Sequence, residues 1–173
     1  MAGAPSGPFQ HGRGVHGQYV YAIIFPQPTA EVLANQGVKQ PSDFDGRTFR
    51  ELVVKCHAEC DETLVETAFF KEPHANGTFH LNLLVRATSQ YRWKKVADRL
   101  REHYKVHVNF GQNIRTWAAG VVYFKVASEH KKPEELDPTG GEQWHKDGCP
   151  TPFEEFLPRD WRQPGFVHCA ALR

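Results

Sequence analysis

The dipeptide Asn76-Gly77 is the feature that most restricts how this chain can fold. It separates two runs that are rich in β-branched and aromatic residues, 63–72 and 78–87. Asn-Gly between two such runs is a strong signal for a β-hairpin, because both residues tolerate the positive φ angles of tight hairpin turns. We therefore expect two neighbouring antiparallel strands in the middle of the chain.

Periodicity on either side of the hairpin predicts further elements. Two segments have the composition of strands: 18–27 and 105–110. Three segments have apolar residues at helical spacing: 47–60, 90–104 and 115–129. In the last of these, Val121 and Val122 also permit a strand. The order predicts an α+β fold, with a central antiparallel β-sheet of about five strands packed with helices, of the ferredoxin-like or RRM-like type.

The chain has 173 residues, of which 40% are hydrophobic, and this suits one packed domain. We expect a flexible N-terminus at 1–17, a folded domain at 18–137, and a Pro-rich C-terminal extension at 138–173. The extension is expected to wrap the core or to lead to a further domain. The net charge of +1 argues neither for nor against binding to nucleic acid, so any basic surface must be local.

The sequence has the features of an intracellular protein, in the nucleus or another reducing compartment. Four cysteines are few for a disulfide-rich secreted scaffold, and the N-terminus lacks the apolar stretch of a secretory signal. No apolar run reaches about 18 residues, so we expect no membrane partner. A zinc set could be assembled from Cys56, His57, Cys60, His145 and Cys149, but its halves are about 85 residues apart, and reduced structural thiols are favoured.

The length of the hairpin loop decides which side chains share a face of the sheet. A two-residue turn would place Glu72 opposite Leu81, on the wrong side. A three-residue loop at 75–77, with Gly77 in the left-handed conformation, places Glu72 opposite His80 and on the same face as Asn82. A carboxylate, an imidazole and an amide oxygen suit Mn²⁺ or Mg²⁺. The alternative is a solvent-facing sheet surface with a cross-strand Glu-His pair.

The stretch "KEPHANGTFHLNLLV" resembles the second motif of HUH-family replication initiators, the Rep endonucleases. In that motif a Glu precedes a His-hydrophobe-His or His-hydrophobe-Gln pair by about eight residues, across a short hairpin. "QYVYAIIFPQ" resembles the first strand motif of the family. The stretch from "QYRWKKVADRL" to "HKKPEELD" is similar to the nuclease domains of eukaryotic HUH transposons of the replitron type. The resemblance covers roughly 18–137.

The resemblance implies a Rep nuclease fold and a role for each matching residue. Glu72, His80 and Asn82 would bind the metal, with Asn82 standing where the family has a second histidine or a glutamine. Tyr123 would be the nucleophile, and Lys125 would place positive charge near the phosphate. The family spacing is Tyr-x-x-Lys, whereas Lys125 follows Tyr123 at the second position here, and a π-bulge would restore the orientation of the tyrosine.

Basic and aromatic side chains near the second predicted helix are candidate contacts for single-stranded DNA, because phosphates need positive charge and unpaired bases stack on aromatic rings. The candidates are Arg86, Tyr91, Arg92, Trp93, Lys94, Lys95, Arg115 and Trp117. For Trp93 the alternative is a place in the core, and for the lysines it is an ordinary solvated surface.

Two functions of different classes follow. The first, implied by the resemblance, is a metal-dependent tyrosine endonuclease and strand transferase that acts on single-stranded DNA in transposition or rolling-circle-type replication. The second is a non-catalytic module that binds single-stranded nucleic acid on an RRM-like sheet. A polar set at Glu72, His80 and Asn82 favours the first, since an RRM exposes aromatic rings there. A helicase domain beyond residue 173 is a further partner that the sequence leaves open.

Overall fold

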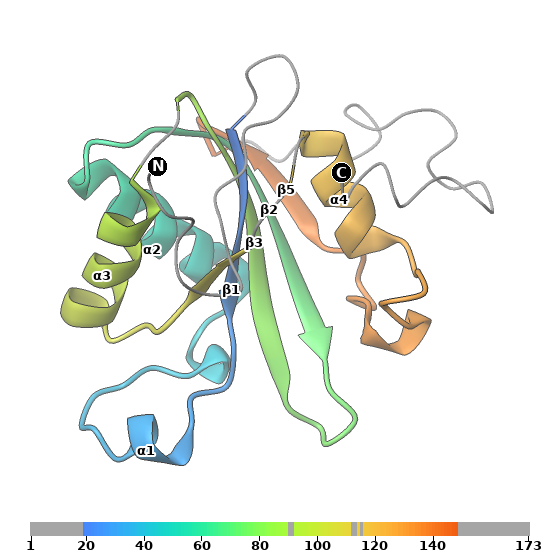
Figure 1. Ribbon diagram of the computed structural model, residues 1–173, viewed down its shortest axis with the longest axis horizontal. Helices are drawn as coiled ribbons and strands as arrows, with labels where there is room; N and C mark the ends of the chain where they lie inside the picture. The colour runs from blue at the N-terminus through green and yellow to red at the C-terminus, as the bar shows by residue number, and fades with distance from the viewer. Residues whose placement is uncertain (1–18, 90–91, 112–113, 115, 149–173) are drawn as a thin grey trace, which may run out of the picture.

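The two strands of the predicted hairpin lie side by side near the centre of a five-stranded sheet (Figure 1). The structure is a computed structural model, and it describes residues 19–89, 92–111, 114 and 116–148. The strands are β1 (Tyr19–Phe25), β2 (Leu64–Pro73), β3 (Phe79–Ala87), β4 (Asn109–Gly111) and β5 (Glu142–His145). They are ordered β4-β1-β3-β2-β5, and every neighbouring pair is antiparallel. The predicted α+β class with an antiparallel sheet is confirmed.

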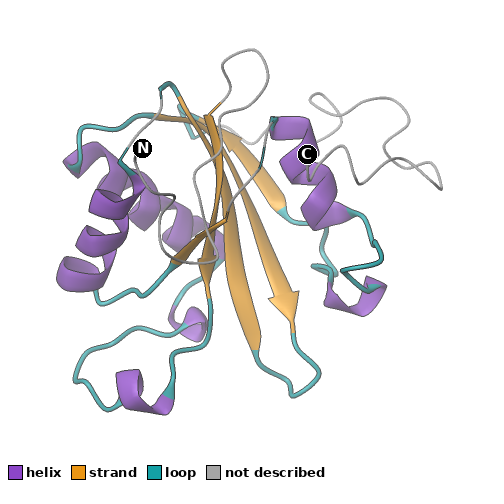
Figure 2. Ribbon diagram, in the orientation of Figure 1, coloured by secondary structure: helices purple, strands orange, loops and turns teal. Residues whose placement is uncertain are grey.

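Helices cover both faces of this sheet (Figure 2). They are α1 (Ala30–Leu33), α2 (Gly46–Glu59), α3 (Trp93–Tyr104) and α4 (Trp117–Lys125), with two short 3₁₀ helices, η2 (Pro41–Asp43) and η3 (Pro133–Glu135). Figure 1 shows α2 and α3 on one face and α4 on the other. Apart from the short elements, the order β1-α2-β2-β3-α3-β4 follows the β-α-β-β-α-β pattern of ferredoxin-like domains, with α4 and β5 added.

Alternation along the strands divides the core into two layers. The layer beneath α2 and α3 includes Tyr21, Ile23, Leu81, Leu83 and Val85, together with Val96 and Leu100 of α3. The layer beneath α4 includes Val20, Ala22, Ala68, Phe70 and Leu84, together with Trp117, Val121 and Phe124. Even-numbered residues of β3 therefore face α4, as expected from a period of two. His80 and Asn82 share this face with Leu84.

The strand predicted at 105–110 is shorter in the structure, where β4 begins at Asn109. The first part of the predicted segment forms the C-terminal cap of α3. Lys105 takes a left-handed conformation at the C-cap of α3, with φ of 59°. The amide of Val106 then donates to the carbonyl of Leu100 at 3.0 Å, which closes the helix. Strand pairing with β1 is recorded only from Asn109 onward.

The predicted C-terminal extension contributes to the sheet, because β5 at 142–145 pairs with β2 along the outer edge. Just beyond that pairing, the backbone amide of Lys71 donates to Oδ2 of Asp137 at 2.7 Å. The predicted flexible segment 1–17 and residues 149–173 lie outside the described residues. Among the residues that the structure does describe, no helix is both long and apolar enough to span a membrane.

Gly120 allows α4 to approach the sheet closely. A Cβ atom at this position would lie 2.8 Å from both Cδ atoms of Leu84 and 3.2 Å from Cγ2 of Ile114. Leu84 is fully buried on β3, so it has little space into which it can move. The absence of a side chain at Gly120 therefore sets the distance between α4 and the strand that carries His80 and Asn82.

We expect Gly120→Ala to lower the free energy of unfolding by about 1–3 kcal/mol, because overpacking against Leu84 exceeds the gain in helix propensity. Chemical denaturation measures the change. The matched test is Leu84→Ala, which should cost less in the Gly120→Ala background than in the wild type, since the shortened side chain makes room for the new methyl group. If the loss of unfolding free energy in the double variant equals the sum of the losses in the two single variants, the two residues do not crowd each other.

Candidate active site

The hairpin has the register that aligns the candidate polar residues. Glu72 pairs with His80, and Phe70 pairs with Asn82. The amide of His74 donates to the carbonyl of Thr78 at 2.8 Å, so the loop contains three residues, and Gly77 has φ of 84°. This left-handed conformation is one that glycine adopts without a steric penalty. Of the two loop lengths considered from the sequence, the three-residue loop is thus the one formed.

Glu72 is a buried carboxylate with two polar contacts, one at each oxygen. Its Oε2 lies 2.8 Å from Nε2 of His80, and its Oε1 contacts Nζ of Lys131. Burial by itself raises the pKa of the Glu72 carboxyl, but the hydrogen bond to His80 and the charge of Lys131 outweigh burial and hold the pKa below its ordinary value. Glu72 is therefore ionised at neutral pH despite its position.

His74 is a functional candidate that the sequence analysis did not select. Its Nε2 lies 2.9 Å from Nδ1 of His80, and the two ring centroids are 4.8 Å apart. His80 is thus held at both nitrogens, by Glu72 on one side and by His74 on the other. The signal was available in the sequence, since His74 follows Glu72 by two residues and positions two apart in an extended chain point to the same side. His74 comes directly after the end of β2.

Asn82 shares the face of Glu72 and His80 but lies deeper in the structure. It is paired with Phe70 on β2 and with Ile24 on β1, and only 1% of it is exposed. Its buried Nδ2 has no hydrogen-bond partner among the described residues. A rotation of the amide by 180° would exchange nitrogen and oxygen and place an acceptor at that position.

The donor set fits a divalent cation only if Asn82 takes part. No group of three His, Cys, Asp or Glu side chains in the described part of the chain is arranged to hold a metal. Glu72 and His80 supply a carboxylate oxygen and an imidazole nitrogen in contact with each other, and the unpaired buried amide of Asn82 would supply the third ligand. Mixed oxygen and nitrogen donors of this kind suit Mn²⁺ or Mg²⁺.

Tyr123 lies beside this set, on the helix that covers the same face. The Lys131 Nζ atom that contacts Glu72 also lies 4.6 Å from the centre of the Tyr123 ring and 4.7 Å from that of Phe124. The half-buried Tyr123 has a raised pKa, because of burial first and then of the negative charges of Glu72 and Glu135. The helix is regular from 117 to 125, so Tyr123 reaches this position without a π-bulge.

Lys125, the predicted partner of the nucleophile, points elsewhere. Its Nζ donates to the carbonyl of Gly140 at 2.7 Å and so ties the end of α4 to the loop before β5. The cation near the tyrosine is Lys131, which follows α4 on a turn closed by a backbone hydrogen bond of 2.8 Å from Ser128 N to Lys131 O. Sequence spacing gave no signal for Lys131, because 59 residues separate it from Glu72.

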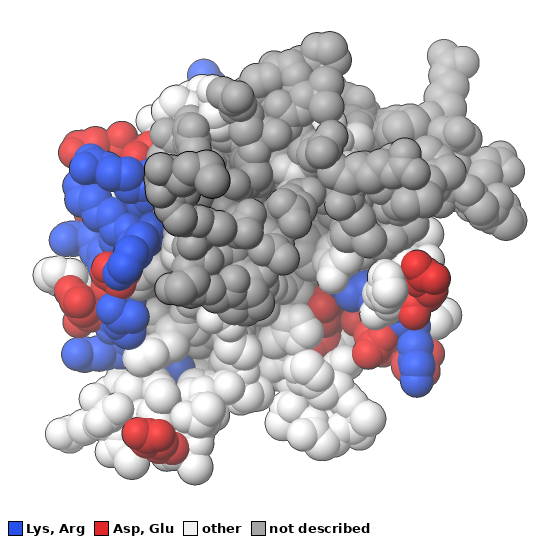
Figure 3. All heavy atoms as spheres, viewed as in Figure 1, with Lys and Arg blue, Asp and Glu red and all other residues white. Residues whose placement is uncertain are grey.

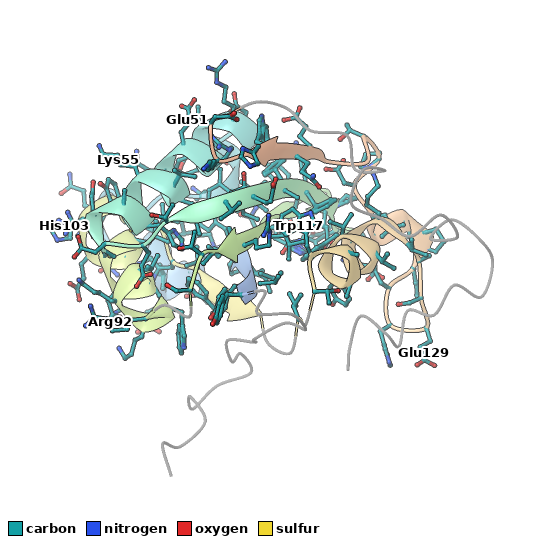
Figure 4. The ribbon with its side chains drawn as sticks, turned by 90° about the horizontal axis from the view of Figure 1, so that it is seen from above. Glu51, Lys55, Arg92, His103, Trp117 and Glu129 are labelled. Carbon is teal, nitrogen blue, oxygen red and sulfur yellow. The ribbon has the colours of Figure 1, made fainter. Side chains whose placement is uncertain are left out.

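The candidate DNA contacts on α3 lie on the far side of the sheet from Tyr123. Figure 3 shows Lys and Arg side chains gathered over the flank where α3 runs, and Figure 4 shows Arg92 on that side of the sheet and Glu129 on the other. Arg92, Lys94 and Lys95 are exposed. Trp93 is half-buried and packs on Phe110, with ring centroids 5.5 Å apart.

The remaining candidates are divided between the core and the site face. Trp117 is 3% exposed, and its Nε1 donates to Oε1 of Gln143 at 3.3 Å, so its ring belongs to the core. Arg86 faces the same side as His80 but lies six residues along β3, about 20 Å away, and pairs with Glu66 at 3.5 Å. Tyr91 and Arg115 lie outside the described residues.

The alternative zinc set is not supported by the buried thiols. Cys56 and Cys60 are both free and buried on α2 and at its end. Burial is the main cause that raises the pKa of the Cys56 thiol to about 12, so the metal-binding thiolate form is disfavoured. Nδ1 of the fully buried His57 lies 2.7 Å from the carbonyl of Val53. Cys149 lies outside the described residues.

Comparisons of the chain with protein-family models, with curated proteins and with solved structures give no match in any of the three. The assignment of a function therefore depends on the geometry of the site itself.

We expect Glu72→Gln to lower the free energy of unfolding near neutral pH by about 3–5 kcal/mol, because it leaves Lys131 as a buried charge without its carboxylate. The folded-state pKa of Glu72 is lowered, so its contribution is present above the unfolded value of 4.5 and is lost as the pH falls through the lower folded value. The variant should therefore lose less stability than the wild type below about pH 4.5.

Denaturant unfolding at several pH values measures this difference. The control is Glu129→Gln, which removes a carboxylate that is 84% exposed and whose partner is the solvent-exposed His130. That variant should follow the wild-type pH profile. An unchanged acid response in Glu72→Gln would show that the ion pair does not contribute to stability.

Proposed function

We propose that this protein is a tyrosine-dependent endonuclease and strand transferase that acts on single-stranded DNA. One observation supports the proposal above all others. The Lys131 ammonium contacts Glu72 and lies over the ring of Tyr123, so a tyrosine from α4 and a Glu-His pair from the β2–β3 hairpin form one cluster. A nucleophile, a cation and a candidate metal-ligand pair are the components that phosphodiester cleavage through a covalent intermediate requires.

In the proposed step, Oη of Tyr123 attacks the phosphorus atom in line with the leaving 3′ oxygen. The Oη–P bond forms as the P–O3′ bond breaks, which leaves a 5′-phosphotyrosine ester and a free 3′ hydroxyl. The phenol proton is released to solvent, and the leaving oxygen takes a proton from solvent, so no other reactant is consumed. Because one phosphodiester replaces another, a second 3′ hydroxyl can attack the ester and rejoin strands.

The phenol of Tyr123 starts the reaction in its protonated form, since its pKa is raised by burial and by Glu72 and Glu135. A positive charge close to the ring acts against the raised pKa, because it stabilises the negatively charged phenolate as the proton leaves. Lys131 is placed to supply that charge, at 4.6 Å from the ring centre. His74 holds the far nitrogen of His80 and so fixes the orientation of the imidazole beside Glu72.

A divalent cation, Mn²⁺ or Mg²⁺, would be held by Glu72, His80 and Asn82. When bound, it would stabilise the negative charge that develops on the phosphate. The chain's own contribution is to keep Glu72 ionised in a buried position and to hold His80 at both ring nitrogens.

The binding-module alternative requires an open sheet face with exposed aromatic rings. In this structure α4 packs on the face that carries the polar set, and Phe70 on that face is fully buried and stacks on Phe124, with ring centroids 4.9 Å apart. The other face is covered by α2 and α3. This arrangement favours the nuclease over an RRM-like binding surface.

Tyr123→Phe should abolish both strand cleavage and the covalent adduct, because the ring of phenylalanine has no oxygen to attack phosphorus. Folding and DNA binding should be retained. The assay is incubation with single-stranded oligonucleotides and Mn²⁺, followed by a denaturing gel for a protein-linked band and mass spectrometry of the linked peptide. Tyr104→Phe is the matched control, since Tyr104 lies on α3, on the other side of the sheet, and should leave the adduct unchanged.

Each contrary result has its own meaning. An adduct on Tyr91 or Tyr104 would keep the function and refute the assignment of Tyr123. Cleavage by Tyr123→Phe would make water the nucleophile and the protein a hydrolase without a covalent step. If the wild type forms no adduct with any single strand, the binding module becomes the better proposal.

Single-stranded DNA is the proposed partner, and the basic surface of α3 would bind it on the side of the sheet away from Tyr123. Replacing Lys94 and Lys95 together with Ala should weaken binding and flatten the dependence of log K on log salt by about 1–2, since two phosphate contacts are lost. The cleavage rate at saturating DNA should not change. Lys71→Ala, which removes an exposed lysine of β2, is the control. An unchanged salt dependence would place the DNA elsewhere.

A further inference from the structure

Lys131 is a buried lysine, and lysine side chains are rarely buried unless they are paired. Only 7% of it is exposed, and its Nζ atom contacts Oε1 of Glu72 and the ring faces of Tyr123 and Phe124. A carboxylate and two aromatic faces are all partners that attract a cation. The ammonium of Lys131 thus occupies a position that would also attract a metal cation. It is in direct contact with Glu72, the candidate metal ligand.

We propose that Lys131 and the divalent cation compete for Glu72, and that the displaced Lys131 ammonium then pairs with the phosphate that Tyr123 attacks. This inference rests on the proposed function and adds a role for a residue outside the expected metal set. It makes Lys131 the residue that couples metal binding to DNA binding.

The competition follows from how the two carboxylate oxygens are used. Oε2 of Glu72 faces Nε2 of His80 at 2.8 Å, and Oε1 faces Lys131. A cation bound between Glu72 and His80 must displace at least one of these contacts. In a buried site, a doubly charged ion beside an ammonium group also costs much more free energy than it would in water. Metal on Glu72 and Lys131 on Glu72 therefore exclude each other.

The surroundings of Lys131 determine where the ammonium goes after displacement. The residue lies on the turn 128–131 after α4, and its long side chain reaches Glu72 across Tyr123 and Phe124. An ammonium that leaves Glu72 remains next to Tyr123, where the proposed reaction places a phosphodiester anion. DNA would then provide Lys131 with a new partner, so DNA and metal should each strengthen the binding of the other.

Lys125 offers a matched comparison within the same segment. It is the lysine that sequence spacing assigned to the reaction, but its Nζ donates to the carbonyl of Gly140 and not to Glu72. Removing its charge should therefore leave the competition for Glu72 intact. A general effect of net charge on metal affinity would appear equally in variants of both lysines.

The test is a Mn²⁺ titration of the full chain, with free Mn²⁺ measured by electron paramagnetic resonance, so that no activity is needed. Lys131→Met should bind Mn²⁺ at least about tenfold more tightly than the wild type, in the range by which neighbours of metal ligands change affinity. Lys125→Met should bind like the wild type, and Glu72→Gln should lose binding. Lys131→Gln removes the charge but keeps a hydrogen-bond donor, and it should also bind Mn²⁺ more tightly.

The second arm adds a single-stranded oligonucleotide in the Tyr123→Phe background, in which no adduct should form. The oligonucleotide should tighten Mn²⁺ binding when Lys131 is present and should have little effect in Lys131→Met. Circular dichroism checks that each variant is folded, and Lys131→Gln provides the measurement if Lys131→Met is not.

Equal Mn²⁺ affinity in the wild type and in folded Lys131 variants would overturn the inference, as would an equal effect of oligonucleotide with and without Lys131. If no protein binds Mn²⁺ but the Tyr123 adduct still forms, the competition is refuted and the tyrosine chemistry stands. If Mn²⁺ binds more tightly to the Lys131 variants but no adduct ever forms, the competition stands and the nuclease proposal fails.

Discussion

The register of the β2–β3 hairpin is the constraint on which the rest of the site depends. A loop one residue shorter would rotate Glu72 to the other face of the sheet, where α2 and α3 pack, because side chains alternate at every position. The left-handed Gly77 permits the three-residue loop, and the loop aligns Glu72 with His80. The position of the Glu72 carboxylate is thus decided by the backbone conformation of a residue in the turn.

A buried negative charge organises the side chains around it. Glu72 is ionised below the surface, and this state is stable only because His80 and Lys131 take one oxygen each. The same requirement orients Lys131 over Tyr123, which links a residue of α4 to the hairpin by electrostatics in addition to the apolar packing of this helix on the sheet. The sheet separates this cluster from the basic surface of α3, so substrate binding and chemistry would use opposite faces of one thin layer.

Local signals in the sequence predicted the hairpin and the shared face of His80 and Asn82, since a turn dipeptide and a period of two fix them within a few residues. The register was narrowed to two loop lengths, and the turn dipeptide alone did not decide between them. The order of strands and helices followed from periodicity in the same way. Lys131 could not be predicted, because its contact with Glu72 depends on the path of the chain after α4, which has no periodic pattern. Strand β5 was missed for a similar reason, as only four residues pair, in a segment rich in Gly, Pro and charge.

The edge of β2 next to Asp137 is protected against pairing with strands of other molecules. Strand β5 covers the edge only along 66–69, and an aspartate side chain accepts the amide of Lys71 just past the end of that pairing. An edge amide that is already bonded cannot recruit a strand from another molecule. A chain truncated before Asp137 would lose both β5 and this aspartate, and the exposed edge of the ten-residue strand β2 would then favour self-association.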